Sequence, residues 1–301
     1  MKERETGFSE MNLRDVVNLA LLASLRLMIF ATGLSAEPRH AVCLLQKPRE
    51  LGRMFFAMFV VMPALALAMV RTFNLNAAVK IALVTFALSP IPPLMPRRAA
   101  KVSVATDYII GLLVAASLLS IVFVPLAMEL LERILGRPLT MSPGAVAKQM
   151  LVGVLAPLGA GMIVRHLAQD VAERLTKPVS DIAVSVLVAC VTVILVSGRH
   201  ALAALIGNGT ILAITVFVGA GLAVGHLLGS PDAERRSVLA ISTSTRHPGL
   251  AVAMAQANFP TQKLAGAAVV LCLLAGAVLG TPYMRWVNSK RGARTVRARR
   301  V

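Results

Sequence analysis

The sequence predicts an all-α polytopic membrane protein with about nine transmembrane helices, arranged as inverted repeats of four plus five helices with two broken crossing helices. Three observations lead to this prediction. Of the 301 residues, 57 % are hydrophobic and only 15 % are charged. The apolar residues fall into blocks of about 20, the length at which a helix crosses a bilayer. Two of these blocks are polar and interrupted by proline at corresponding positions of the two halves.

The apolar blocks are separated by short gaps that carry proline, glycine or charged residues, as turns do. The mean hydropathy of the chain is +0.76. No gap is long enough for a soluble catalytic domain. The first repeat is expected to cover residues 1–133 and the second residues 142–288. The expected spans are residues 16–36, 51–70, 76–96, 104–128, 146–165, 179–198, 209–229, 236–257 and 264–287.

The basic residues indicate an orientation in the membrane. The net charge is +17, but most Lys and Arg lie in or beside the gaps, which argues against a nucleic-acid partner. The gaps that follow the odd-numbered spans lie on the same side of the membrane as the C-terminal end. This side carries about twice as many Lys and Arg as the other, and the richer side is expected to be cytoplasmic. This predicts an outside N-terminus and a basic cytoplasmic tail at 289–301. The tail is expected to touch anionic lipid, with partner binding as the alternative.

The first break ends the third span with four prolines in the seven residues 90–96, which cannot continue an α-helix. On its own this pattern fits either a helix that ends at the cytoplasmic surface or a helix broken inside the membrane. The residues of this break that we expect to bind substrate are Ser89, Pro90, Pro92 and Pro93.

The second break lies within the eighth span, where a guanidinium, an imidazole, several hydroxyls and a Pro-Gly pair replace hydrocarbon. A charge in a membrane span costs several kcal/mol unless it faces a polar cavity or a partner. A Pro-Gly pair also frees backbone groups that need new partners nearby. This pattern predicts a substrate or ion site formed by Ser242, Thr243, Thr245, Arg246, His247, Pro248 and Gly249.

The two breaks occupy the next-to-last span of each half, a pattern that indicates a transporter built from inverted repeats. Where two broken helices cross, half-helix N-termini present partial positive charge, and Arg246 adds a full positive charge. The combination favours an organic anion. His247 makes coupling to protons possible, because imidazole titrates near neutral pH. A lipid bilayer and a small-molecule organic anion are therefore the expected partners, and the sequence does not indicate an oligomeric state.

Asp107, near the start of the fourth span, is the carboxylate most expected to lie in or at the edge of the membrane. It forms a natural opposite-charge pair with Arg246 and is included among the substrate-binding residues. The alternative is an interfacial Asp107 that faces water. Ser89, Thr106 and Asp107 are weak candidates for sodium ligands. No cofactor is expected, and the three cysteines are too far apart for a metal site.

These residues resemble the bile acid:sodium symporter superfamily over about residues 16–287. The resemblance rests on Gly33-Leu34, on the Ser-Pro-x-Pro-Pro signature at 89–93 and on the Arg-His-Pro-Gly signature at 246–249. It points to an uncharacterised bacterial branch of that superfamily. The resemblance implies a panel domain and a core domain, two crossing broken helices, alternating access for organic anions and a place in the bacterial inner (plasma) membrane.

The chain departs from the sodium-coupled members of this superfamily at both breaks. Those members carry Cys-Pro-Gly-Gly followed by Ser-Asn in the first broken helix, where this chain has Met95 and Pro96. In the second they carry a Glu and, four residues on, Gln-Asn, where this chain has Ser242 and then Arg246-His247. The main acidic sodium ligand is therefore missing. We expect coupling that is not strictly to sodium, with Arg246 replacing one cation electrostatically.

Two other functional classes compete with a transporter. An intramembrane enzyme needs a nucleophile–base pair or a metal cluster, and the chain has neither a His-Glu-x-x-His pattern nor a paired Asp motif. The protein is therefore not expected to be an enzyme. A sensor or structural membrane protein that uses a transporter fold without flux is the remaining alternative. The leading hypothesis is a secondary transporter of a small or amphipathic organic anion that works by alternating access.

Overall fold

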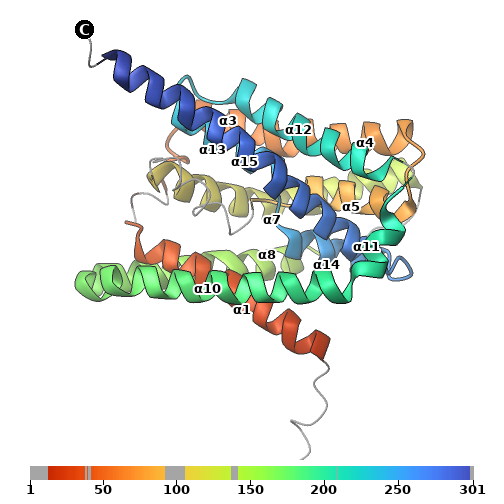
Figure 1. Ribbon diagram of the computed structural model, residues 1–301, viewed down its shortest axis with the longest axis horizontal. Coiled ribbons are helices and arrows are strands. Elements are labelled where there is room, and N and C mark those ends of the chain that lie inside the picture. Colours follow the sequence, from red (N-terminus) through yellow and green to blue (C-terminus); the bar gives the residue numbers. More distant parts are fainter. Residues whose placement is uncertain are drawn as a thin grey trace, which may run out of the picture.

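The computed structural model describes residues 13–37, 39, 42–91, 106–136, 142–207 and 209–298. The regular elements in these ranges are all helices, which confirms the all-α class (Figure 1). They are α1 (Leu13–Leu34), α3 (Pro48–Phe55), η1 (Phe56–Val61), α4 (Met62–Thr72), α5 (Ala77–Leu88), α7 (Thr106–Leu135), α8 (Pro143–Met150), η2 (Leu151–Leu155), α9 (Ala156–Leu167), α10 (Gln169–Ser197), α11 (Arg199–Leu205), α12 (Thr210–Leu228), α13 (Ala233–Ser244), α14 (Pro248–Asn258) and α15 (Ala265–Ala298).

Within the described ranges, 6 helical rods are long and apolar enough to cross a membrane. Two are composite: Pro48–Thr72 joins α3, η1 and α4, and Pro143–Leu167 joins α8, η2 and α9. The apolar part of α1 (Leu19–Leu34) and α5 are shorter apolar helices. The expected eighth span is divided between α13 and α14. An integral membrane protein is therefore supported, whereas nine crossings, the inverted repeats and the orientation of the termini stay predictions.

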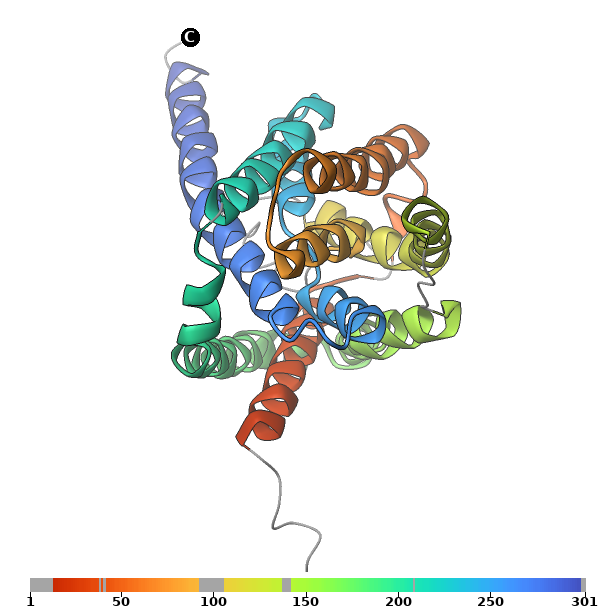
Figure 2. The same cartoon turned by 90° about the vertical axis from the view of Figure 1, so that its right-hand side faces the viewer.

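Helix α1 packs against α9 and α10, and these helices form one group, which we call the α1 group. Figures 1 and 2 show α1 and α10 together on one side of the molecule, away from α3, α4 and α12. Glycines permit the close approach of α1 and α9. A Cβ atom on Gly161 would lie 2.8 Å from the Cα of Gly33, and a Cβ atom on Gly33 would meet the carbonyl oxygen of Leu158. Arg165 Nη1 also donates to the carbonyl oxygen of Leu34 over 3.2 Å, which caps the end of α1.

In the rest of the molecule, α5 packs against α4, α14 and α15, and α12 packs along α13. Glycines spaced four apart on α12 let the α13 backbone approach closely. A Cβ atom on Gly221 would lie 2.7 Å from Ser244 Cα, and one on Gly225 would lie 2.5 Å from Ala240 Cα. Small residues at such spacing are the usual means of close helix packing in membranes. They fix the position of α13, which leads into the second break.

Two helices extend further than their apolar segments. α10 begins at Gln169, well before the expected start at 179, and α15 continues through the basic tail to Ala298. Most of the added residues are polar or charged. Gln, Glu, Lys and Arg are good helix formers, so the helices continue where the hydropathy falls. A short additional helix, α11, occupies the gap before α12.

An ion pair connects α3 to the start of α13. Arg235 Nη1 lies 2.7 Å from Glu50 Oε1, and the two side chains are 25 % and 16 % exposed. The guanidinium of Arg235 also lies over the ring of Tyr108 on α7, 5.7 Å from the ring centroid. Three helices are therefore held together at the end of the molecule where α13 begins.

An aromatic cluster connects α12 and α15 near the end of α12. His226 Nδ1 lies 2.8 Å from the hydroxyl oxygen of Tyr283, and the His226 ring centroid lies 5.6 Å from that of Trp286. Lys290 places its ammonium group 4.2 Å from the Trp286 ring centroid, a cation–π contact. His226 therefore has a packing role in this structure, and Tyr283 of the neighbouring helix α15 is its hydrogen-bond partner.

Candidate functional site

The two breaks expected from the sequence lie in contact. α5 ends at Leu88, and Ser89 has an extended backbone. α13 ends at Ser244, and α14 begins at Pro248 after three non-helical residues. The main-chain N–H of His247 donates to the carbonyl oxygen of Pro90 over 2.7 Å. We call this place, formed by residues 89–90 and 245–248, the crossing. The expected second half-helix after the first break falls in residues 92–105, which lie outside the described ranges.

Prolines explain why carbonyl oxygens of the first break accept hydrogen bonds from distant partners. In a continued helix the carbonyl of Ser89 would accept from the residue three or four positions later, and these positions are Pro92 and Pro93. Proline has no N–H, so neither can donate. For the carbonyl of Pro90, the donor three positions later is missing for the same reason, because that position is Pro93. Buried carbonyls without local donors need other partners.

Arg246 supplies one of these partners from the second break. Its Nη1 donates to the carbonyl oxygen of Ser89 over 3.4 Å, and its Nη2 donates to that of Met58 over 2.9 Å. The whole residue is 0 % exposed. Its Nε has no hydrogen-bond partner in the described part of the chain, and no acidic side chain described there pairs with it. The positive charge of Arg246 is thus held in the interior by main-chain carbonyl oxygens, and its Nε–H group remains without an acceptor among the described residues.

The carbonyl of Met58 is available because the helix around it is irregular. Met58 lies in η1, a π-helical segment. In this geometry a carbonyl accepts from the N–H five residues later, and that residue is Pro63, which has none. The unused oxygen then accepts from Arg246. Met58 and Pro63 lie in an apolar segment, so the sequence analysis did not identify them. The signal that could have found them is the proline inside an expected span.

His247 caps the helix that follows the break. It is 3 % exposed, and its Nδ1 accepts the main-chain N–H of Leu250 over 3.2 Å. An Nδ1 that accepts a hydrogen bond carries no proton, which places the proton of the neutral ring on Nε2. Gly249 makes room for this arrangement, since a Cβ atom there would lie 3.1 Å from His247 Cε1. The Pro-Gly pair therefore starts α14 and accommodates the imidazole.

The hydroxyls before the break are buried and donate to their own helix. Ser242 donates to the carbonyl of Val238, Thr243 to that of Leu239, and Thr245 to that of Ile241, at 2.7 to 2.8 Å. Their oxygen lone pairs remain available, so toward any further partner these hydroxyls act as acceptors. Gly276 on α15 accommodates the break, because a Cβ atom there would lie 2.7 Å from Thr245 Cγ2.

The structure thus brings together eight of the residues expected to bind substrate, from two distant parts of the chain: Ser89, Pro90, Thr245, Arg246, His247, Pro248 and Gly249 at or beside the break, and Ser242 one turn earlier on α13. Thr243 lies on the same buried turn. Pro92 and Pro93 lie outside the described residues. Thr106 and Asp107 begin α7, but their side chains are also outside them, so the pairing of Asp107 with Arg246 stays a prediction.

Among the described residues, no group of three or more His, Cys, Asp or Glu side chains is arranged to hold a metal ion. Sodium prefers oxygen ligands such as carbonyls, hydroxyls and carboxylates, and the crossing is rich in the first two. The carbonyl oxygen of Ser89 in the crossing and that of Met58 beside it are already occupied by the guanidinium of Arg246.

Comparison with known proteins gives two matches. The model of the sodium bile acid symporter family matches residues 22–205, more than half of the chain. This match runs from α1 to α11, so the second break lies beyond it. The chain is also similar to the uncharacterized sodium-dependent transporter YocS of Bacillus subtilis (strain 168). The two are 24 % identical over 299 residues, which cover 94 % of this chain and 89 % of the relative. The chain therefore belongs to the sodium bile acid symporter family.

Proposed function

We propose that this protein is a secondary transporter that moves a small or amphipathic organic anion across a bilayer by alternating access. Membership of a transporter family supports transport in place of catalysis. The observation that carries the proposal is Arg246, a fully buried guanidinium at the contact of two helix breaks with no acidic partner among the described residues. A buried charge inside a membrane protein is costly, and it marks a site that binds something of opposite charge.

The crossing has the chemistry to bind a carboxylate or sulfonate. A guanidinium has five N–H donors, and two atoms of Arg246 bond carbonyls while its Nε remains unused. α14 begins at Pro248, so the positive end of its dipole points to the same place. Ser89, Asp107 and the residues of the second break are the proposed contacts.

Burial of the site supports alternating access. Residues 242–246 are fully buried, so a substrate reaches Arg246 only after helices move. We propose movement between the α1 group and the remaining helices. The Gly33–Gly161 contact holds α1 and α9 together, and the Gly221 and Gly225 contacts hold α12 and α13 together, so each side can move as a unit. We further propose a bacterial inner membrane location, with the N-terminus outside.

Family and relative both indicate a sodium-dependent transporter. We propose that Arg246 takes one of the cation positions of this chain, because its guanidinium already bonds the carbonyls of Met58 and Ser89. Any sodium that is bound uses other oxygens, for which Ser89, Thr106 and Asp107 are the candidates. His247 offers a protonatable group as the alternative coupling device. Its neutral ring carries the proton on Nε2, so a second proton would bind at Nδ1 and would displace the hydrogen bond from the N–H of Leu250.

Transport is tested by reconstituting the purified protein into liposomes and measuring uptake of radiolabelled bile acids, short carboxylates and sulfonates. Uptake that exceeds the equilibrium level under an ion gradient is expected for at least one anion. The matched controls are empty liposomes and liposomes with Arg246→Ala. Saturable binding of an anion to the purified protein without any flux would overturn the proposal and favour a sensor.

The coupling ion is tested by repeating uptake with sodium, potassium or choline outside and with a pH gradient. Wild-type uptake is expected to persist without sodium. Arg246→Ala vacates two carbonyl oxygens, so any uptake it retains should gain a dependence on sodium. Sodium-dependent uptake that is the same in wild type and Arg246→Ala would contradict the role given to Arg246.

A further inference from the structure

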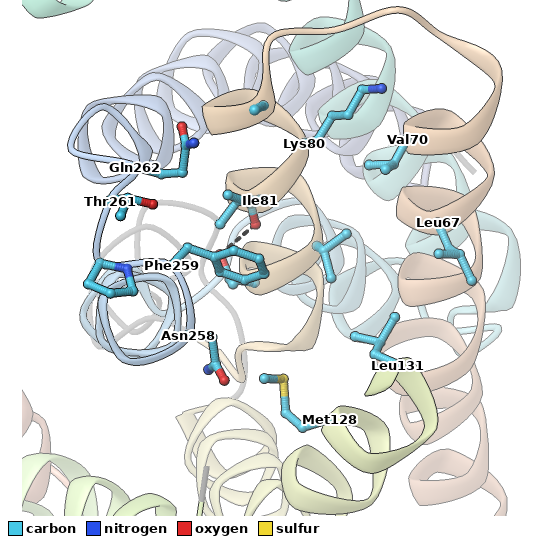
Figure 3. Close-up of a pocket in the computed structure, with 14 residues that line it drawn as sticks. Leu67, Val70, Lys80, Ile81, Met128, Leu131, Asn258, Phe259, Thr261 and Gln262 are labelled. Carbon is cyan, nitrogen blue, oxygen red and sulfur yellow. Dashed lines mark hydrogen bonds between the residues drawn. The ribbon is translucent and has the colours of Figure 1, made fainter. Parts of the chain in front are cut away.

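A cavity of about 360 Å³ lies away from the crossing, among α4, α5, α7 and the end of α14 (Figure 3). We call it the α5–α14 cavity. Its wall follows α5 from Ala77 to Thr85 and closes against the turn that runs from Asn258 to Gln262. This volume falls in the range of about 300–1,000 Å³ that small-molecule sites occupy. Arg246 and His247 do not line it.

One end of the cavity carries hydrogen-bond donors without partners. Lys80, Thr261 and Gln262 line it, and in the described part of the chain none of their side chains makes a hydrogen bond or an ion pair. No Asp or Glu lines the cavity. Figure 3 shows Lys80 and Gln262 at one end and Met128 and Leu131 at the other. The cavity therefore has a polar, positively charged end and an apolar end.

Helix ends reinforce the charge at the polar end. α5 begins at Ala77, so its positive end and Lys80 in its first turn face the same space. The negative end of the α14 dipole opposes this charge, but some of the carbonyl groups at the end of α14 already accept hydrogen bonds. The carbonyl of Met254 accepts from Asn258 Nδ2 over 2.9 Å, and the carbonyl of Ala255 accepts from the N–H of Phe259 over 2.8 Å. The net field at the polar end favours an anion.

The apolar end fits hydrocarbon. Leu67 of α4 and Val84 of α5 face Met128 and Leu131 of α7 across the cavity. Methionine is flexible and polarizable, so it adapts to an aliphatic chain. Thr85 lies at the deep end, 2 % exposed, with its hydroxyl bonded to the carbonyl of Ile81 over 2.9 Å. One helical turn beyond it is Ser89, which belongs to the crossing.

We infer that the α5–α14 cavity is a binding site for an amphipathic carboxylate, distinct from the crossing. The carboxylate lies beside Lys80, where the ammonium group hydrogen-bonds it. The hydrocarbon tail lies against Met128 and Leu131. The occupant contacts α5 and α14, the two helices that lead away from the crossing. The site requires neither Arg246 nor transport, so it stands or falls independently of the proposed function.

The test uses full-length protein in lipid nanodiscs and a decanoate that carries a diazirine at the end of its tail. Ultraviolet light crosslinks the tail to its neighbours, and mass spectrometry locates the adducts. Saturable labelling of peptides with Met128 or Leu131 is expected, with competition by unlabelled decanoate. Octanoate should compete more weakly, by roughly fourfold for each methylene removed. Decyltrimethylammonium, with the same tail and a cationic head, should not compete.

Variants locate the head group. Lys80→Gln should weaken labelling at least tenfold, and Val84→Phe should block it by filling the cavity. Lys148→Gln on α8 is the matched control and should label like wild type. Arg246→Ala should also label like wild type, which separates this site from the crossing. Thermal unfolding of each variant verifies that it is folded. Labelling unaffected by Lys80→Gln, or adducts spread over lipid-facing helices, would overturn the inference and leave Lys80 as an interfacial residue.

Discussion

The main-chain N–H of His247 donates a 2.7 Å hydrogen bond to the carbonyl oxygen of Pro90. The neighbouring contact joins Arg246 to the carbonyl oxygen of Ser89, which is 157 residues earlier in the chain. Each partner lies at a helix break, where the local chain offers no helical hydrogen bond. The two breaks thus satisfy one another's backbone groups. In the low-dielectric interior of a membrane this exchange is what allows irregular backbone to persist.

Arg246→Lys keeps the charge at the crossing but cannot reproduce the divergent bonds to Met58 and Ser89. One carbonyl is then left unpaired, which should lower the free energy of unfolding by about 1–3 kcal/mol. Uptake should fall further in Arg246→Ala, which loses the charge as well. Thermal unfolding and liposome uptake measure the two effects. Arg26→Lys, at an exposed position of α1, is the matched control and should change neither.

Pro63→Ala introduces an N–H where the π-helical segment has none. This donor competes with Arg246 for the carbonyl of Met58, so uptake should fall several-fold. Stability should be unchanged or higher, because proline is the least favourable residue in a helix, by about 3 kcal/mol relative to alanine. Pro178→Ala removes a proline inside α10, distant from the crossing, and should leave uptake intact. A Pro63→Ala protein with full uptake would disprove the role of the freed carbonyl.

Gly225→Ala should disturb the packing of α12 on α13. The new methyl group would lie 2.5 Å from Ala240 Cα, a backbone atom that cannot move alone. Overpacking of this kind costs about 1–3 kcal/mol. Gly219→Ala is the control on the same helix, since nothing lies within 4 Å of its new Cβ atom. Equal unfolding temperatures for the two variants would show that α13 shifts freely.

The ion pair between Glu50 and Arg235 should contribute measurably to stability. A double-mutant cycle with Glu50→Ala and Arg235→Ala is expected to give a coupling of about 1 kcal/mol, the upper end for partly exposed pairs. The matched cycle uses Glu129 and Arg133, whose side chains are 58 % and 76 % exposed. That pair should give about 0.3–0.5 kcal/mol or less. Similar couplings in both cycles would mean that burial adds nothing at the start of α13.

The sequence predicted the second break correctly, because Pro248 and Gly249 follow polar and charged residues that also do not suit a membrane-spanning helix. Proline alone is not sufficient, since α10 continues through Pro178. The sequence also predicted contact between the breaks, because freed backbone groups in a membrane need each other. The break between α13 and α14 and the bond from His247 to Pro90 confirm these points. Both predictions depend on residue chemistry that acts locally, within a few residues of a proline.

Contacts between distant apolar segments could not be predicted from the sequence. Met58 looks like any other core methionine until the π-helix frees its carbonyl and the fold brings Arg246 to it. The same holds for Gly225 and Gly276, whose role is to leave space for a particular neighbour. Hydropathy also failed to locate the start of α10 and the end of α15, where charged residues continue a helix into the polar gap.

The chain contains a single tryptophan, Trp286. Its ring packs at a tilt against those of His226 and Tyr283 and contacts the ammonium group of Lys290. Indole emission depends on the charge and polarity around the ring. The protein therefore carries its own fluorescent reporter, free of background from other indoles, at the contact of α12 with α15. A change in emission on adding a ligand would follow the motion of these two helices in real time, without any label.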